Sequence, residues 1–139
     1  MPKAHDRKTL DELDPPAWGE PEYSSHLVTT CHRLRKKPIG SFTAEELRIM
    51  IGQSIGLEHL IPRALVLLEA DPLTAGDYFP GDLLQNVLSV ESKFWLEHRE
   101  LHRRARAILT PSLEARLGPS DGSLREKIRA FCQTEGPSR

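Results

Sequence analysis

The amino-acid sequence predicts an all-α protein, an irregular bundle of six to eight helices in a single domain. Apolar residues recur at spacings of three and four along most of the chain, which is the period of a helix. Motifs that begin helices, together with Pro and Gly, separate these runs from one another. Strand signals are poor, because no long stretch alternates apolar and polar residues with β-branched enrichment. With 139 residues and 38% apolar side chains, the chain can build one core and has little room for a second.

Residues 1–22 are expected to form an N-terminal segment that contains one short helix. Thr9 and Glu12 match a capping box, in which a cap threonine and a glutamate three residues later bond each other's backbone amides. Pro15-Pro16 should end this helix, because the residue before a proline avoids the helical conformation.

A second helix should follow the Pro- and Gly-rich connector that runs from Trp18 to Tyr23. Ser24 is its predicted cap. Lys36 and Lys37 fall in its last turn, where cations suit the helix dipole, and Pro38 should end it. Four apolar residues share one face of this helix: Leu27, Val28, Cys31 and Leu34.

The clearest helix start in the sequence is Thr43, with Glu46 as its partner in a second capping box. Phe42 and Leu47 occupy the two positions of a hydrophobic staple across this start. A break is expected near Gly56, because glycine costs about 1 kcal/mol relative to alanine inside a helix. The apolar stripe of the helix comprises Leu47, Met50, Ile51 and Ile55.

The segment 57–68 predicts the central core helix, because it is apolar on most sides. Pro62 should lie in its first turn or mark a kink. Val66 and Leu67 add to an apolar stripe that consists of Leu57, Leu60, Ile61, Ala64, Leu65 and Leu68.

The longest loop spans residues 71–82 and leads into another helix. Pro80 is expected to be the first residue of that helix, with Asp82 in its positively charged first turn. The apolar face of the helix comprises Leu83, Leu84, Val87 and Leu88.

Two further helices are expected toward the C-terminus. The first should run from Ser92 until Pro111 interrupts it, with Phe94, Leu101, Ala105 and Ile108 in register. The second should begin at a capping box formed by Ser123 and Glu126, after the break at Gly118-Pro119. Residues 134–139 are expected to be a flexible tail. The stripe of the last helix comprises Leu124, Ile128, Phe131 and Cys132.

Charge is distributed unevenly, although the whole chain has a net charge of only −1. Residues 43–82 hold seven acidic and two basic residues, a net −5. Residues 26–37 carry +4 and residues 91–139 carry +3, while residues 1–22 carry −3. The bulk balance does not indicate a nucleic-acid or membrane binder. The acidic middle block is either ordinary solvated surface or a docking face for a basic partner.

The expected location is a reducing cytoplasm. No run of 18 apolar residues predicts a spanning helix, and the first seven residues lack the apolar region of a secretion signal. Cys31 and Cys132 lie far apart and suggest neither a disulfide framework nor a zinc site.

The sequence does not indicate an enzyme, and no catalytic residue, metal or cofactor is expected. It contains neither a phosphate-binding loop nor a dinucleotide fingerprint. His98 and His102 could share a helix face, but Arg99 stands where a metalloprotease has glutamate, so a solvated face is expected. Cys31 and His32 are adjacent and point about 100° apart on a helix, which favours a buried cysteine beside an exposed histidine.

The alternative function is a helix-turn-helix regulator that binds nucleic acid through residues 43–68. The outline fits, with a capped helix, a short turn and a second helix. The second helix would read bases with residues 57–63, which hold one Arg, one Glu and a Pro, and the local charge does not suit phosphates. The basic run at residues 99–106 would suit nucleic acid better, although a solvated helix face is its ordinary interpretation.

Several segments together resemble a known family. They read CHRLRKKPI at residues 31–39, FTAEELRIMIGQ at 42–53, LIPRAL at 60–65 and DPL followed by GDYFPGDLL within 71–84. They are similar to the immunity proteins of bacterial contact-dependent growth inhibition (CDI) systems. Leu10 to Leu13 followed by Trp18 also fits the N-terminal pattern of that family, and Phe79 before Pro80 is a minor departure from it. The resemblance covers roughly residues 9–95.

This resemblance implies an immunity-protein-like helical core at residues 23–95, followed by a C-terminal helical extension at residues 96–133. It also implies a small cytoplasmic protein without catalysis, which binds and blocks the toxic C-terminal domain delivered by a neighbouring cell. The implied partner is that cognate toxin domain, and the expected class of toxin is a nuclease, with a ribonuclease favoured. Nucleic acid, membrane and small molecules are not expected as direct partners.

A candidate toxin-binding site follows from the chemistry of such a partner. A nuclease cleft must be positive to hold phosphates, and an inhibitor can occupy it with carboxylates of its own. Aromatic side chains are common anchors in interfaces. In the alternative, the 71–82 loop only packs onto the core, with Asp82 as a helix-dipole partner, and Trp18 and Trp95 are core residues. The candidate residues are Glu69, Asp71, Asp77, Tyr78 and Asp82.

Overall fold

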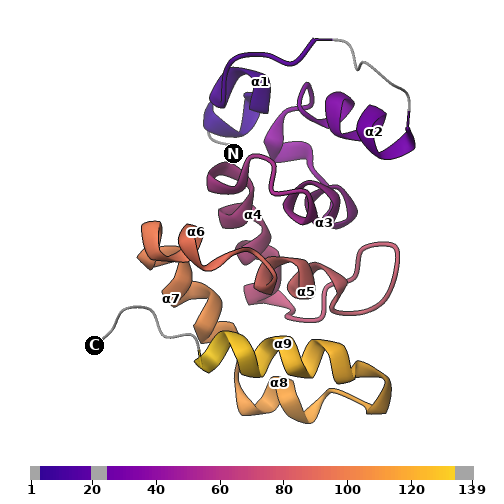
Figure 1. Cartoon of the computed structure of the whole chain (residues 1–139), viewed down its shortest axis with the longest axis vertical. Coiled ribbons are helices and arrows are strands. Elements are labelled where there is room, and N and C mark those ends of the chain that lie inside the picture. Colours follow the sequence, from indigo (N-terminus) through magenta and orange to yellow (C-terminus); the bar gives the residue numbers. More distant parts are fainter. Residues whose placement is uncertain (1–3, 20–24, 134–139) are drawn as a thin grey trace.

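The computed structural model describes residues 4–19 and 25–133, and over these residues the fold is all-α, as the sequence predicts (Figure 1). The described part contains nine α-helices, one more than the upper bound of the prediction, three short 3-10 helices and no strand. The α-helices are α1 (Leu10–Leu13), α2 (His26–Leu34), α3 (Ala44–Gly52), α4 (Leu57–Ala70), α5 (Asp82–Leu88), α6 (Ser92–Glu97), α7 (Arg99–Ile108), α8 (Pro111–Ala115) and α9 (Gly122–Gln133). The 3-10 helices are η1 (Ala4–Arg7), η2 (Ile39–Ser41) and η3 (Pro119–Asp121).

The arrangement centres on α4, which contacts α3, α5 and α7 (Figure 1). The N-terminal helices α1 and α2 lie at one end of the molecule, and α8 and α9 lie at the other, below α5. Helix α9 packs directly on α5. None of the helices in the described ranges combines the length and the apolar character that a membrane span needs.

The buried face of α4 confirms that it is the central core helix. Val66, by contrast, is 58% exposed, so the prediction of a helix wrapped on most sides is wrong at this position. Pro62 lies in the second turn, inside the helix, and the helix continues to Ala70. Five residues of α4 are fully buried: Leu60, Ile61, Ala64, Leu65 and Leu68.

Both of the first two predicted capping boxes are confirmed. The Thr9 amide donates to the Glu12 carboxylate at 2.9 Å, and the Glu12 amide donates to the Thr9 hydroxyl at 3.3 Å. Thr43 and Glu46 repeat this pattern at 2.9 and 3.2 Å. These local contacts satisfy backbone donors that a helix start leaves without a partner in the helix.

Helix α2 begins one residue later than expected. Its cap is Ser25, whose hydroxyl accepts from the Val28 amide at 3.1 Å, whereas the predicted cap Ser24 lies outside the described residues. The part of the predicted connector that follows Gly19 and the predicted tail 134–139 also lie outside the described residues. Cys31 and Leu34 are buried, but Leu27 is 43% exposed and does not belong to the core face.

The predicted start of α5 is wrong by two residues. The helix begins at Asp82, and its cap is Gly81 in the left-handed region at a φ of +94°. Pro80 therefore precedes the helix, where it forms an isolated bridge with Ala75 that closes the preceding loop. The predicted apolar face is confirmed, since Leu83, Leu84, Val87 and Leu88 are buried.

The predicted long helix after Ser92 is divided at His98 into α6 and α7. His98 leaves the helical conformation, with a φ of −133° and a ψ of 66°. Its ring stacks on Phe94, with centroids 4.2 Å apart, and its Nδ1 lies 2.9 Å from the Phe94 carbonyl oxygen. The break therefore coincides with packing of aromatic rings, for which the sequence contains no Pro or Gly signal.

The predicted capping box at Ser123 is wrong. Helix α9 starts at Gly122, so Ser123 is already its second residue. The preceding turn is held instead by Asp121, whose carboxylate accepts from the Gly118 amide at 2.8 Å. The stripe of the last helix is confirmed, because Leu124, Ile128 and Phe131 are buried and Cys132 packs against them.

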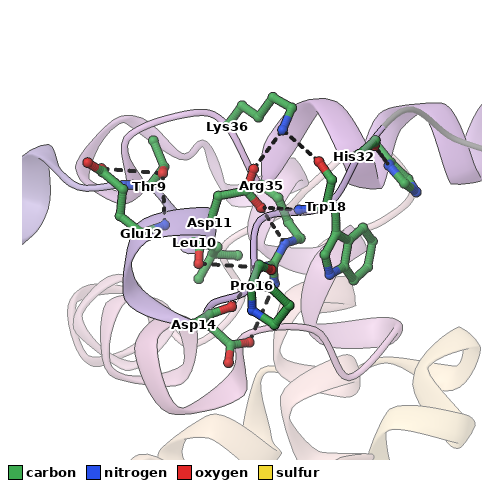
Figure 2. Close-up of polar contacts among 11 residues, drawn as sticks. Thr9, Leu10, Asp11, Glu12, Asp14, Pro16, Trp18, His32, Arg35 and Lys36 are labelled. Atoms are coloured by element: carbon green, nitrogen blue, oxygen red, sulfur yellow. Dashed lines mark hydrogen bonds and ion pairs between the residues drawn. The ribbon is translucent and has the colours of Figure 1, made fainter.

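A buried arginine fastens the N-terminal segment to α2 (Figure 2). Arg35 is only 2% exposed, and its Nε donates to the Asp11 carboxylate at 2.9 Å. Its guanidinium also donates to the backbone oxygens of Leu10, Asp14 and Pro16, the shortest of these bonds being 2.7 Å to Asp14. The same group lies 4.6 Å from the ring centre of Trp18. No charge or motif in the sequence marks Arg35 for this role, although it follows the buried Cys31 by four residues and so shares its helix face.

Asp11 binds a second cation, Lys36, and we call the cluster of Asp11, Arg35, Lys36 and Trp18 the clasp. Lys36 donates to its other oxygen at 2.6 Å, and the Trp18 amide donates to the first at 3.1 Å. Burial alone would raise the pKa of Asp11, but hydrogen bonds from Lys36, from the Trp18 amide and from Arg35 outweigh it and lower the pKa to about 2. The folded protein therefore holds this carboxylate ionised far below its ordinary pKa of 3.8.

We expect this pKa shift to make the clasp sensitive to acid. A lowered folded-state pKa contributes stability that is present above the unfolded pKa and is lost as the pH falls through the folded pKa. The full contribution is about 2 kcal/mol. The free energies of unfolding of the wild type and of Asp11→Asn should therefore differ most above pH 5 and converge toward pH 2. Urea titrations at several pH values measure this, and a difference that does not depend on pH would contradict it.

Candidate functional site

The loop of residues 71–82 connects α4 to α5 and projects from the side of the molecule (Figure 1). It contains four of the five candidate residues, namely Asp71 at its start, Asp77 and Tyr78 near its tip, and Asp82 at its end. Its two arms are joined by the bridge between Ala75 and Pro80. The bridge closes the loop at its base, and residues 76–79 form its tip.

Asp82 holds the tip of this loop from the inside. Its carboxylate accepts hydrogen bonds from three backbone amides, those of Gly76 at 2.6 Å, Tyr78 at 3.0 Å and Phe79 at 3.4 Å. The residue is only 3% exposed and is the first residue of α5, where the helix dipole favours an anion. Asp82 therefore supports the loop and does not present its carboxylate to a partner.

Helix α3 provides a second anchor for the tip. Glu45 accepts from the Asp77 amide at 2.8 Å and from Arg48 at 2.7 and 2.5 Å, so that two nitrogens of the guanidinium face its carboxylate. The hydrogen bond with Arg48 is the main reason that the pKa of Glu45 is lowered, against the effect of burial. Arg48 also lies 3.8 Å from the Asp82 carboxylate and thus links the two anchors.

Two glycines allow the loop to approach these anchors. A Cβ at Gly76 would clash with the Glu45 carboxylate and lie 3.1 Å from that of Asp82. A Cβ at Gly81 would lie 2.7 Å from Leu124 of α9, and its φ of +94° strains any other residue. The loop is thus fixed to α3 and α5 and lies close to α9.

The fixed tip exposes two aromatic side chains and a carboxylate. Tyr78 is 73% exposed and Phe79 is 39% exposed, while Asp77 is an exposed residue. The guanidinium of Arg48 lies 4.2 Å from the centre of the Tyr78 ring and supports it through a cation–π contact. The alternative, in which Tyr78 and Phe79 only pack the loop onto the core, does not account for this exposure.

The other two candidates lie away from the tip and pair with arginines of the C-terminal helices. Glu69 accepts two hydrogen bonds from Arg104, both at 3.0 Å, and Asp71 lies 3.5 Å from Arg116. These partly exposed pairs contribute at most about 1 kcal/mol each, so a binding partner could displace them. The acidic block is therefore not a patch of free carboxylates, because several of its acids pair with arginines of this chain.

Arg48 belongs to the candidate site through its contacts with Glu45, Asp82 and Tyr78, and the sequence alone did not identify it. The available signal was local, because Glu45 and Arg48 are three residues apart on a predicted helix and face the same side. Their connection to residues 76–82 is not local and could not be seen in the sequence.

The structure does not favour the helix-turn-helix alternative. Arg63, the one cation of the proposed reading helix, donates to the Asp6 carboxylate at 2.8 Å and to the Gly40 oxygen. Helix α4 is the central helix of the core, so it is not a projecting element that could enter a groove.

His98 and His102 pack against aromatic rings, so the expectation that they lie on a solvated helix face is wrong. His98 stacks on Phe94, and His102 lies 5.1 Å from the Phe131 ring. Cys31 is buried, which raises the pKa of its thiol, and His32 lies 4.8 Å from Trp18. Across the described residues, no group of three or more His, Cys, Asp or Glu side chains is placed to hold a metal ion.

In comparison with known proteins, most of the chain matches the model of one protein family. Residues 12–105 match the family model of the CDI immunity proteins. The match includes the complete 71–82 loop together with α3, and it ends within α7. No curated protein matches the chain.

Proposed function

The chain belongs to the CDI immunity proteins, and on this premise we propose that it binds and neutralises the C-terminal toxin domain of a cognate CDI effector. It acts in the cytoplasm as a stoichiometric inhibitor and catalyses no reaction. The toxin is a nuclease, with a ribonuclease as the favoured class, and the bound immunity protein blocks its active site.

The observation that carries this proposal is the aromatic tip of the 71–82 loop. Tyr78 and Phe79 are exposed, although the backbone that presents them is held by Asp82 and Glu45. Exposed aromatic residues serve as anchors in protein interfaces, and a loop that is already ordered loses little entropy on binding. These two properties together suit a surface that binds a protein partner.

The chemistry of the tip also suits a nuclease cleft. Such a cleft is basic because it holds phosphates. Asp77 offers an exposed carboxylate beside the two aromatic rings, and a cation of the cleft can pair with it. The partner contact is thereby concentrated at residues 77–79 and does not depend on the paired acids Glu69 and Asp71.

Co-expression tests the class of function. The cognate toxin domain should arrest growth when expressed alone, and co-expression of this chain should restore growth. The two purified proteins should elute together from a sizing column as an equimolar complex. Growth arrest that persists despite normal expression of the immunity protein would contradict the proposal.

Asp77→Lys should weaken toxin binding by about 2 kcal/mol or more, because it places a cation against a basic cleft. The substitution leaves the Asp77 amide available to Glu45, so the loop keeps its anchors. Glu97→Lys is the matched control, since it makes the same charge change at an exposed residue of α6. Calorimetric titration with the toxin domain measures both, and wild-type affinity in Asp77→Lys would remove this residue from the site.

A further inference from the structure

A groove of about 470 Å³ opens beside the 71–82 loop. Phe79 and Pro80, at the end of the loop, form one of its walls, and Gln85 of α5 also lines it. The opposite wall comes from the C-terminal unit, which we define as α8, η3 and α9. Ser120, Ser123 and Leu124 line that side.

The groove joins two parts of the chain with different relations to the family. Its loop wall and Gln85 lie inside residues 12–105, which match the family model, whereas the wall from the C-terminal unit lies outside them. Leu124 also packs closely against Gly81, where a Cβ would lie 2.7 Å from its side chain. The lack of a side chain at this glycine therefore allows α9 to lie close to the loop.

The lining chemistry specifies what the groove can receive. Phe79, Pro80 and Leu124 provide apolar surface, and the polar groups of Gln85, Ser120 and Ser123 can form hydrogen bonds. The charged residue among those that line it is Asp121, which is negative. The groove therefore favours an apolar side chain that is accompanied by a cation.

On the basis of the proposed function, we propose that this groove receives an apolar side chain of the cognate toxin domain, with a basic toxin residue beside Asp121. The groove is continuous with the exposed tip, because Phe79 belongs to both. The C-terminal unit is thus a second part of the toxin-binding surface. A basic nuclease cleft offers the required cation.

Filling the groove tests this proposal. Ser123 is exposed, so Ser123→Trp places a large ring in the groove without removing a buried contact. We expect the affinity for the toxin domain to fall at least about ten-fold, while the thermal unfolding midpoint stays near that of the wild type. Ser112→Trp is the matched control, because Ser112 is an exposed residue of α8 that does not line the groove, and its affinity should be unchanged.

A second variant keeps the test decisive if the tryptophan disturbs the fold. Ser120→Lys adds a cation at an exposed position of the groove and should also weaken binding at least about ten-fold. Asp121 itself is unsuitable, because its carboxylate supports the Gly118 amide.

The outcomes separate this proposal from the one on which it rests. If Ser123→Trp and Ser120→Lys bind as the wild type does, while Tyr78→Ala loses affinity, the groove is not a toxin site although the loop is. If the chain alone forms a dimer that Ser123→Trp dissociates, and toxin binding is unchanged, the groove holds a second copy and the proposal is overturned. If the wild type fails to bind the toxin domain, the proposed function itself fails.

Discussion

Replacing Arg35 with methionine should lower the free energy of unfolding by about 3–5 kcal/mol, the cost of breaking a buried ion pair by removing one partner. Methionine keeps much of the apolar stem but provides no donor. The Asp11 carboxylate, 10% exposed, would lose one of its two cations, and the carbonyl oxygens of Leu10, Asp14 and Pro16 would lose the guanidinium that they share. The short helix α1 would then have few remaining polar contacts to α2.

The urea midpoint measures this loss, and a matched variant on the same segment isolates it. Arg33→Met removes a cation only two residues away, but Arg33 is exposed, so the change should stay within about 0.5 kcal/mol. Arg35→Lys retains the positive charge but lacks the planar guanidinium with its several donors, so its loss of stability should lie between those of Arg35→Met and Arg33→Met. Equal midpoints for Arg35→Met and Arg33→Met would show that the clasp contributes nothing to stability.

Replacing Tyr78 with alanine should weaken toxin binding by at least about 2 kcal/mol, which is roughly 30-fold, and leave the fold intact. The side chain is 73% exposed, so its loss removes little buried surface from the free protein. Its ring, which lies over Arg48, is instead available for burial against the partner. Tyr78→Phe keeps the ring and this stacking and should retain most of the affinity.

A second exposed apolar residue provides the control for Tyr78→Ala. Leu96 of α6 is 49% exposed and lies in a different part of the chain, so Leu96→Ala should bind the toxin domain as the wild type does. Calorimetric titration gives the affinities, and urea unfolding confirms that each variant is folded. Equal losses in Tyr78→Ala and Leu96→Ala would mean that the effect is not specific to the loop.

Features of the fold with local causes could be predicted from the sequence. The starts of α1 and α3 depend on residues three positions apart, and both capping boxes are present. The break before α4 follows from Gly56, which has a φ of +64°. By contrast, the division at His98 accompanies the stacking of its ring on Phe94, and no backbone signal marks it.

In the candidate site, too, features with local causes could be predicted from the sequence, and features that depend on distant residues could not. The 71–82 loop and its exposed Tyr78 could be located from turn residues and the family resemblance. The states of the carboxylates could not, because Glu69 pairs with Arg104 and Asp71 with Arg116, cations that are distant in the sequence. The net charge of a segment counts such acids as available, whereas the fold decides which of them are paired.

The anchors of the 71–82 loop have a consequence for how such a protein can change its target. Asp82 and Glu45 hold backbone amides of residues 76–79, and an amide donates in the same way whatever side chain it carries. New side chains at positions 77–79 can therefore be displayed on an unaltered frame. A library randomised at these three positions, selected against a foreign toxin, should yield retargeted variants that still fold.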